Sequence, residues 1–526
     1  MAWYIDQRRT PLRSFFFSEA PDLLLLLVSV VAIGHGRVAS AQEQAVITFS
    51  VRDEADAPLP CRVHLASARG EPQRLSDYPF WHDHMVCLGE LVGDITPGDY
   101  RWTVERGPEF NRASDRVTVV AGQRTMVAVS LKRISHLRSE GWYSGDLHIH
   151  RPVAQIESLM QAEDLDFAPV TTWWNTTARA DSPIGQTEFR WEHRIYTTMA
   201  GEDEREGGAL LYFGLPKPLD LSVKSREVPS PMHFVELART VNERVWIDIE
   251  KPFWWDVPAW LATGQMNSIG LANNHMCRSQ MLANEAWGKP RDAVRLPSPR
   301  GNGRWSQEIY YHILNSGLRL PPSAGSASGV LANPVGYNRV YVHLDQPFTR
   351  DAWFASLSRG RCFVTNGPLL RVRVDGELPG QTLKIGAETP RQVELSIQLT
   401  SNDPVPELEI IYNGRVVQRV TCSGSTNQQH SVALLLDEPG WFLVRAITDV
   451  KETFRFASTA PWYIESDKVS RRISRRAAQF FGDWVEERIA RVKSNVTDPD
   501  ELQEVLSWHL KAREFWRNQI AAANVE

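Results

Sequence analysis

Apolar and polar residues alternate in short runs through the first part of the chain, beginning near residue 45. Residues 46–51 and 117–120 are two such runs, and turns rich in proline and glycine, such as residues 96–100, separate them. Successive side chains of a strand point to opposite faces, so a period of two is typical of a half-buried strand. The pattern predicts a small antiparallel β-sandwich over residues 42–134.

Over residues 135–365 the pattern changes to helical and strand-like runs that follow one another. Helical periodicity covers residues 154–165 and 232–244, and strand-like runs cover residues 167–172 and 245–249. Alternation of this kind predicts an α/β unit.

The period of two returns over residues 366–465, where Asn413-Gly414 between two strand-like runs indicates a tight hairpin turn. This segment predicts a second β-sandwich. Residues 466–526 show helical periodicity, with a second helix expected to start at Asp498-Pro499. The expected architecture is a central α/β unit, two flanking β-sandwiches and a C-terminal helical hairpin.

The first 41 residues have the pattern of an export signal. The apolar run is about 11 residues long, too short for a comfortable membrane span, although an uncleaved anchor is the alternative. We expect cleavage after Ala41, a mature protein in the periplasm or outside the cell, and no stable membrane span. The pattern consists of Arg8, Arg9 and Arg13, the apolar residues 23–33, and the small residues Ala39, Ser40 and Ala41.

Composition excludes some functions. The formal charge of -5 gives no general attraction to nucleic acid or to an anionic membrane. The chain has five cysteines, and export makes disulfides possible. Cys61 and Cys87 lie in one predicted sandwich and could pair.

The histidines His148 and His150, in the sequence Gly-Asp-Leu-His-Ile-His, are the most informative candidates for chemistry. On an extended segment, side chains two positions apart share one face. Both imidazoles can therefore reach one cation, with Asp146 placed to support them. The alternative is a pair of hydrogen-bonded structural histidines.

Polar clusters follow three predicted strands of the central unit, at the strand ends where α/β proteins usually carry their sites. If these ends open on one face of a barrel, their side chains meet the two histidines. The alternatives are a charged loop, a structural ion pair and a loop histidine. The clusters are Glu202-Asp203-Glu204 after residues 195–199, Glu250-Lys251 after residues 245–249, and Asn273-Asn274-His275 after residues 268–272.

Tryptophan is frequent, with 19 residues in the chain. Many lie near the candidate positions, where they either fill a large core or wall a pocket with aromatic rings. These are Trp142, Trp173, Trp174, Trp191, Trp254, Trp255 and Trp260.

His82 and His84 form a second alternating pair, in the predicted first sandwich. We interpret them as part of a polar loop packed on its own sandwich; the alternative is that this loop reaches across to the central site. The chain has no glycine-rich phosphate loop, and the small residues 324–329 do not match a Gly-x-Ser-x-Gly nucleophile elbow.

At these residues the chain resembles the PHP (polymerase and histidinol phosphatase) superfamily, specifically its exported carbaryl-hydrolase-like branch. The resemblance covers residues 136–380 and rests on residues 145–150, on Gly201-Glu202-Asp203 and on residues 360–368. It implies a distorted (β/α)7 barrel flanked by two β-sandwiches. It also implies up to three divalent ions in a cleft and hydrolysis of phosphoesters or carbamate-type esters.

The chain departs from the family pattern at three places. Thr172–Asn175 replace an Asp-His pair, Lys251-Pro252 replace His-Pro, and residues 325–329 lack the closing Asp-x-His. Too few ligands remain for three ions, so we expect one, zinc or manganese. The expected ligands are His148, His150, Glu202, Asp203, Glu250 and His275.

The sequence thus predicts an exported metal-dependent hydrolase that acts on an ester, phosphoester or carbamate-type bond through a metal-activated water. Glu250 or His275 would move protons, and Lys251 and Arg151 would stabilise negative charge. The alternative is a catalytically degenerate barrel that binds an extracellular ligand such as a glycan. Either way the expected partner is a small molecule or glycan, and no nucleic acid.

Overall fold

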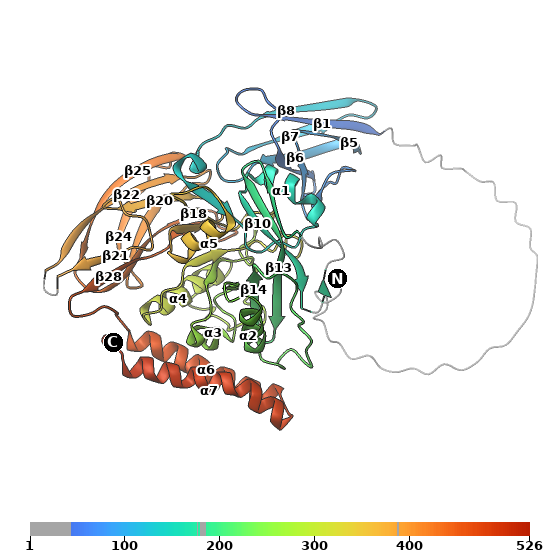
Figure 1. Ribbon diagram of the computed structural model, residues 1–526. Coiled ribbons are helices and arrows are strands. Elements are labelled where there is room, and N and C mark those ends of the chain that lie inside the picture. Colours follow the sequence, from blue (N-terminus) through green and yellow to red (C-terminus); the bar gives the residue numbers. More distant parts are fainter. Residues whose placement is uncertain (1–43, 176, 179–185, 387–388) are drawn as a thin grey trace, which may run out of the picture. The chain divides into compact units, whose positions relative to one another are not determined.

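The computed structural model of the chain describes residues 44–175, 177–178, 186–386 and 389–526 (Figure 1). Its first part is a β-sandwich whose two sheets enclose a core that includes Ile47, Phe49 and Val63. One sheet has the order β5–β1–β8 and the other β3–β4–β2–β6–β7. The strands are β1 Ala45–Arg52, β2 Cys61–Ser67, β3 Phe80–Trp81, β4 His84–Cys87, β5 Glu90–Ile95, β6 Gly98–Glu105, β7 Ala113–Val119 and β8 Arg124–Ser130.

This sandwich is not purely antiparallel, because β1 and β8 run parallel to each other. The chain crosses from one sheet to the other between β7 and β8, which brings the first and last strands side by side. The alternating pattern predicted the strands and could not reveal this crossover.

Cys61 and Cys87 occupy directly opposite positions in the β2–β4 pairing, and their Sγ atoms lie 3.7 Å apart. Both side chains are buried free thiols. The structure therefore places the two cysteines within reach of each other without a bond between them.

In the central part, strand segments are hydrogen-bonded side by side into a closed ring. Residues 146–150 continue β9 and close the ring. On one side Leu147 N donates to Ala324 O at 3.0 Å, and on the other Thr171 N donates to Ile149 O at 2.8 Å. The ring consists, in order, of β9 Trp142–Gly145 with its continuation, β10 Phe167–Trp174, β13 Arg194–Arg205, β14 Gly208–Phe213, β15 Trp246–Ile249, β16 Ser268–Ala272 and β17 Pro322–Ala324.

Four helices connect successive strands of this ring: α1 Ile156–Glu163, α2 Pro231–Val241, α3 Val257–Thr263 and α4 Gly301–Asn315. Short 3-10 helices, η1 Leu137–Glu140 and η2 Val153–Gln155, flank β9, and β11 Thr177–Ala178 and β12 Glu188–Trp191 lie on the way to β13.

The ring departs from the regular strand-helix repeat at β14, which is antiparallel to both β13 and β15. The chain turns from β13 into β14 through Glu206 and Gly207 alone, so no helix intervenes. Strand β13 is also longer than predicted, since its pairing with β14 extends to Arg205. The acidic residues 202–204 therefore lie within a strand and not after its end.

The second sandwich follows with sheet β20–β22–β25 and a sheet built from β21, β23, β24, β26, β27 and β28. Tyr412 pairs with Arg415, which confirms the hairpin turn at Asn413-Gly414. The strands are β20 Leu369–Val374, β21 Thr382–Ile385, β22 Arg391–Thr400, β23 Glu407–Tyr412, β24 Arg415–Thr421, β25 Asn427–Leu436, β26 Gly440–Ile447, β27 Phe456–Thr459 and β28 Trp462–Ser466.

No break in the sheet marks the predicted boundary near residue 365. After the ring come β18 Arg339–His343, α5 Arg350–Ser358 and β19 Cys362–Thr365. Strand β18 pairs with β9, and β19 pairs with both β18 and β27. Backbone hydrogen bonds therefore run continuously from the central part into the second sandwich.

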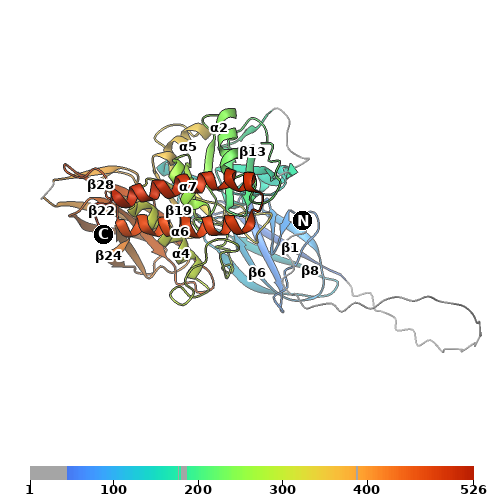
Figure 2. The same cartoon turned by 90° about the horizontal axis from the view of Figure 1, so that it is seen from below.

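Two long helices end the chain, α6 Arg475–Asn495 and α7 Pro499–Ala521, and they lie side by side in both ribbon views (Figures 1 and 2). The Asp498 carboxylate accepts hydrogen bonds from the first amides of α7, so this helix begins where the sequence predicts. The rings of Phe481 and Trp516 stack at 4.7 Å and join the pair.

Within the described ranges, which begin at residue 44, no helix is both long and apolar enough to cross a bilayer. The export signal expected over residues 1–41 lies outside the described residues.

Glu109 lies where the first sandwich meets the central part, and its carboxylate accepts hydrogen bonds from Leu137 N at 2.9 Å and Tyr341 Oη at 3.2 Å. Burial, helped by the charge of Asp164, raises the pKa of Glu109 from 4.5 to about 7. The folded state thus holds this proton more tightly than the unfolded chain. The stabilisation that comes from protonated Glu109 is therefore present below about pH 4.5 and is lost as the pH rises towards 7.

We expect Glu109→Gln to flatten this part of the pH profile and to raise the free energy of unfolding at pH 8 by about 2 kcal/mol. Urea denaturation between about pH 4 and 9 measures both effects. Glu54→Gln, a change at an exposed position, serves as the matched control. An unaltered pH slope in the Glu109 variant would contradict the assignment.

Candidate metal centre

The segment that carries the two histidines is fixed by the carboxylate of Asp146. Its Oδ1 accepts hydrogen bonds from the amides of His148 and Ser326, both at 3.0 Å, and its Oδ2 accepts one from Gly336 N at 2.7 Å. Burial raises the pKa of Asp146 to about 6. Asp146 therefore supports the site through the backbone rather than through the imidazole rings.

His148, His150 and Glu202 bring three ligand atoms together. The two Nε2 atoms are 2.9 Å apart, and Glu202 Oε2 lies 3.2 Å from Nε2 of His148 and 3.1 Å from Nε2 of His150. All three side chains are buried or nearly so. These three residues form a group that could hold a metal ion.

Glu250 does not complete this triangle, although the sequence suggested it as a ligand. Its Oε1 lies 3.2 Å from Nδ1 of His148, the ring nitrogen opposite the one in the triangle. Both of its oxygens also accept hydrogen bonds from Lys251 Nζ, and further ones come from Asn274 Nδ2 at 2.7 Å and Trp254 Nε1 at 3.0 Å. A carboxylate on the far nitrogen orients an imidazole and fixes its tautomer. Glu250 is therefore a positioning residue for His148.

The carboxylates of the site favour a positive charge on His148. Burial alone would lower the pKa of His148, but Glu202 and Glu250 outweigh burial and raise it to about 10. Burial and the charge on His148 lower the pKa of His150. Burial alone would raise the pKa of Glu202, yet the two histidines hold it far below its usual value. The imidazolium of His148 thus lies between Glu202 and Glu250, and the ammonium of Lys251 also contacts Glu250.

Asp203 lies outside the triangle, which departs from the prediction from sequence. Because Glu202 and Asp203 are successive residues of β13, their side chains leave opposite faces of the strand. Asp203 instead forms a buried ion pair with Arg205, with Arg205 Nε donating to Oδ1 at 2.5 Å. Burial raises the pKa of Asp203 to about 6.

Replacing Asp203 with asparagine is expected to leave metal affinity within about twofold while lowering the free energy of unfolding by about 3 kcal/mol, because Arg205 would remain buried without its counterion. The neighbouring change Glu202→Gln should do the reverse and remove metal binding. Titration with zinc and urea denaturation of both variants separate the two roles. Loss of metal binding in Asp203→Asn would instead show that Asp203 is a ligand.

His275 also lies outside the triangle. Its Nδ1 is 3.1 Å from Asn284 O, and its ring packs against Phe253 with centroids 5.2 Å apart. Burial and the nearby charge of Lys251 lower its pKa to about 3, so the imidazole is neutral. The loop after β16 thus uses His275 in local packing and not as one of the three converging ligands.

Lys251 and Arg151, predicted to stabilise negative charge, already contact other groups. The ammonium of Lys251 binds Glu250 and lies 4.5 Å from the centre of the Trp254 ring. Arg151 donates to Gln155 Oε1 at 2.8 Å and lies 5.5 Å over the ring of Trp81, in the β3–β4 hairpin. These contacts orient both side chains.

Close packing explains the run of small residues 324–329. A Cβ atom added at Gly325 would lie 2.6 Å from the Cβ of His148, and one at Gly329 would lie 2.6 Å from the carbonyl oxygen of His150. Real Cβ atoms do not approach so closely. The run closes the ring against the histidine segment, a reason that no motif search could have supplied.

Most of the nearby tryptophans belong to the core. Trp142, Trp173, Trp254, Trp255 and Trp260 are buried. Trp174 and Trp191 are only partly buried.

Trp174 borders the triangle together with Glu204. Its ring lies 5.1 Å from that of His150, and its Nε1 donates to Glu204 Oε2 at 2.9 Å. Glu204 leaves β13 on the same face as Glu202, and burial together with the charges of Glu202 and Glu250 raises its pKa to about 7. The sequence left two roles open for Glu204, a carboxylate of the site at a strand end or part of a charged loop, because it did not reveal the length of β13.

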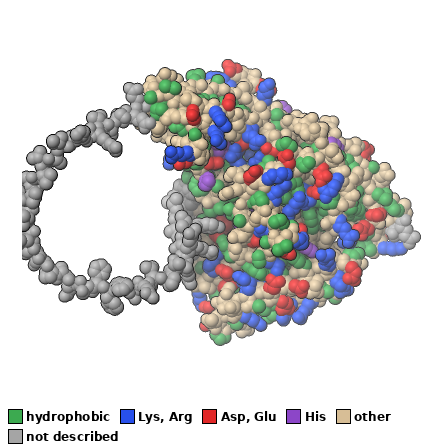
Figure 3. Space-filling view, turned by 180° about the vertical axis from the view of Figure 1, so that it is seen from behind, with side chains coloured by type: hydrophobic (Ala, Val, Ile, Leu, Met, Phe, Trp, Pro, Cys, Tyr) green, Lys and Arg blue, Asp and Glu red, His purple; other side chains and the backbone are tan. Residues whose placement is uncertain are grey.

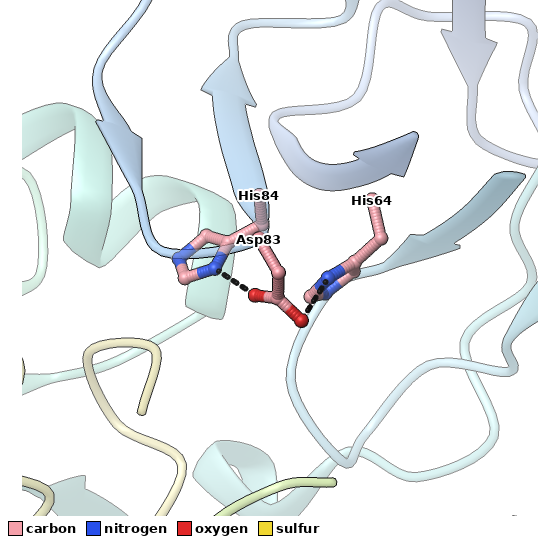
Figure 4. A group of neighbouring side chains, drawn as sticks. All are labelled: His64, Asp83 and His84. Carbon is pink, nitrogen blue, oxygen red and sulfur yellow. Dashed lines mark hydrogen bonds and ion pairs between the residues drawn. The ribbon is translucent and has the colours of Figure 1, made fainter. Parts of the chain in front are cut away.

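A second group, His64, Asp83 and His84, lies in the first sandwich (Figure 4). The Asp83 carboxylate lies 3.2 Å from His64 Nδ1 and 2.9 Å from His84 Nδ1. Arg62 Nε donates to His64 Nε2 at 3.0 Å. This group could also hold a metal ion, although it is separate from the triangle of His148, His150 and Glu202.

His82 and His84 have different surroundings, since His84 is buried and His82 is not. His82 sits in the turn between β3 and β4 with a φ of 53°, and its side chain is exposed. The hairpin nevertheless reaches the central part, since Trp81 Nε1 donates to Leu331 O at 2.7 Å. It contributes no histidine to the triangle.

No family model and no curated protein matches the chain. Among solved structures, the minor pilin GBS52 of Streptococcus agalactiae is 15% identical over 18% of this chain and 47% of its own length, less than half, with a TM-score of 0.16. The CARDB domain of the PF1109 protein from Pyrococcus furiosus, solved in complex with di-metal ions, is 14% identical over 19% of this chain and 90% of its own, with a TM-score of 0.14. No conclusion about this protein rests on likenesses of that size.

Proposed function

We propose that this protein is an exported metal-dependent hydrolase of the PHP type, in which His148, His150 and Glu202 hold one divalent ion. The observation that carries the proposal is the buried triangle of two imidazole nitrogens and one carboxylate oxygen, with edges of 2.9 to 3.2 Å. Its substrates would be small molecules with an ester, phosphoester or carbamate-type bond.

The donor set fits such an ion. Two histidines and one carboxylate are the protein ligands of many catalytic zinc sites. Bond lengths of about 2.0 to 2.1 Å at tetrahedral angles separate neighbouring ligand atoms by about 3.3 to 3.4 Å, slightly more than the edges of the triangle. Three protein ligands leave a coordination position open, which a hydrolase needs. Zinc fits this set best, and manganese is the second choice.

A divalent ion held there would act as a Lewis acid that makes water acidic near neutral pH. The chain's own residues prepare the site. Glu250 holds the ring of His148, and Asp146 holds the backbone beneath it. Proton transfer is assigned to Glu204, which lies on the same face of β13 as Glu202 and is only half-buried.

The alternative of a glycan-binding barrel depended on exposed aromatic rings. Most of the tryptophans near the centre are buried, which leaves Trp174 and Trp191 as partly accessible rings. Trp174 borders the triangle itself, so its position equally suits a substrate of the hydrolase.

The test uses the full chain purified without chelator and three chromogenic substrate classes: an aryl phosphate, an aryl carboxylic ester and an aryl carbamate. We expect about one equivalent of divalent metal, hydrolysis of at least one class, loss of activity after treatment with a chelator, and recovery with zinc or manganese. Protein that binds no divalent ion, or that binds one equivalent and hydrolyses none of the three, overturns the proposal.

A further inference from the structure

A small cavity with a volume of ≈ 60 Å³ is lined by residues of the first sandwich, the central part and the second sandwich together. Its charged lining is dominated by arginine, and none of its lining residues belongs to the metal centre. The arginines are Arg62, Arg112, Arg278, Arg339 and Arg455.

The lining carries fewer carboxylates than arginines. Glu105, Glu163 and Asp403 are the acidic residues. Five guanidinium groups against three carboxylates leave two positive charges in excess. Asp83 lies close by, 3.9 Å from Arg278 Nη1, but it is already shared between His64 and His84 (Figure 4). Positive charge exceeds negative charge even when Asp83 is counted.

Each carboxylate is shared among arginines, as expected where anions are too few. Arg62 and Arg278 both donate to Glu105 Oε2, from Nε at 3.2 and 2.8 Å, and Arg112 Nη1 lies 3.7 Å from its other oxygen. Asp403 accepts hydrogen bonds from Arg112 and Arg455, and Glu163 contacts Arg62 and Arg339.

Two of these carboxylates, Glu105 and Asp403, remain charged. Burial alone would raise the pKa of Glu105, but Arg278 and Arg62 hold it well below its usual value. Burial alone would also raise the pKa of Asp403, but the charges of Arg455 and Arg112 lower it. The excess of positive charge is therefore real at neutral pH.

The chemistry of the lining selects an anion over a metal ion. Guanidinium groups only donate hydrogen bonds, and their planar forks match the oxygen geometry of phosphate and similar groups. A cavity of this size holds a few water molecules or one tetrahedral oxyanion. Figure 3 shows basic and acidic side chains interspersed over the face it presents, so a long polyanion finds no continuous basic track there.

We propose that this cavity binds one small dianionic oxyanion, a phosphate or sulfate group, either free or at the end of a small ester. Entry is possible on the side of Arg112, whose side chain is 33% exposed. Because the lining comes from three parts of the chain, a bound anion would stabilise them together.

The test measures binding of inorganic phosphate, inorganic sulfate and a phosphate monoester, glycerol phosphate, to the full chain by isothermal titration calorimetry, with sodium chloride at equal ionic strength as the reference. We expect one site per chain. Tighter binding of the monoester than of phosphate would identify an ester end as the ligand, and binding of the free ions alone would identify a closed site. Either result supports the proposal.

Arg278→Gln should weaken the affinity at least tenfold, and Arg112→Gln, at the exposed edge, at least threefold. Arg116→Gln makes the same change at an exposed position of β7 outside the cavity and should have no effect. Since phosphate and sulfate also stabilise proteins without binding to a site, the comparison between variants is decisive. Absence of a saturable heat signal, or equal affinities in all three variants, overturns the proposal. If Arg278→Gln does not fold, the comparison of Arg112→Gln with Arg116→Gln provides the test.

Discussion

Replacing His148 with alanine is expected to reduce the bound divalent metal to less than about a tenth of an equivalent, against about one equivalent for the unchanged protein. His148 supplies one edge of the triangle to His150 and another to Glu202, so its removal leaves two ligands. Two ligands do not hold an ion against water at micromolar concentrations. Elemental analysis after gel filtration in metal-free buffer gives the result.

His82→Ala is the matched control, because it removes an exposed imidazole from the turn between β3 and β4. Its metal content should equal that of the unchanged protein. Thermal unfolding of both variants checks that the His148 variant still folds. If folded His148→Ala protein still contained a full equivalent of divalent metal, the result would contradict both the proposed metal centre and the proposed hydrolase.

Glu250→Gln should weaken metal binding without abolishing it, since Glu250 contacts the far nitrogen of His148 and not the centre of the triangle. Loss of such a positioning partner typically weakens metal affinity by about 10- to 100-fold. A zinc titration against a competing chelator measures the change. Complete loss of binding, as in His148→Ala, would show that Glu250 is itself a ligand.

The second large effect is expected for Arg488→Met, which should lower the free energy of unfolding by about 3 to 5 kcal/mol. Arg488 on α6 is buried, and its guanidinium donates to Asp256 Oδ1 at 2.6 Å and to both oxygens of Glu227 at 2.9 and 2.6 Å. Methionine would fill a similar volume but leave two buried carboxylates without a counterion. Urea denaturation followed by tryptophan fluorescence measures the loss.

Arg476→Met makes the same substitution at an exposed position of the same helix and should change the stability by less than about 0.5 kcal/mol. Adding Glu227→Gln and Asp256→Asn to Arg488→Met should recover most of the lost stability, since the unpaired charges are then gone. A loss below about 1 kcal/mol in the single variant would mean that solvent reaches these carboxylates.

The sequence could predict the features that depend on near neighbours in the chain. The alternation of residues gives the strands of both sandwiches, and Asn413-Gly414 gives a hairpin turn because both positions favour a positive φ. His148 and His150 share a face because any extended segment places residues two apart on one side. Local rules of this kind hold wherever the segment lies in the fold.

The choice among the acidic candidates required the tertiary structure. Glu202 and Asp203 are adjacent in sequence and chemically alike, and only the extension of β13 through its pairing with β14 decides which of them faces His148. Glu250 follows β15 as expected, yet the ring brings it to Nδ1 of His148 rather than to Nε2. The same holds for the buried network of Arg488 on α6 with Asp256 and Glu227, residues far from it in the chain.

The residue types and short-range periods along the chain determined that this protein has strands, helices and a pair of histidines on one face. Packing decided which distant groups meet them, because strand register and ring closure set distances between residues that no local rule connects. A shift of one residue in β13 would exchange the faces of Glu202 and Asp203, and that difference carries no signal in the sequence of the strand itself.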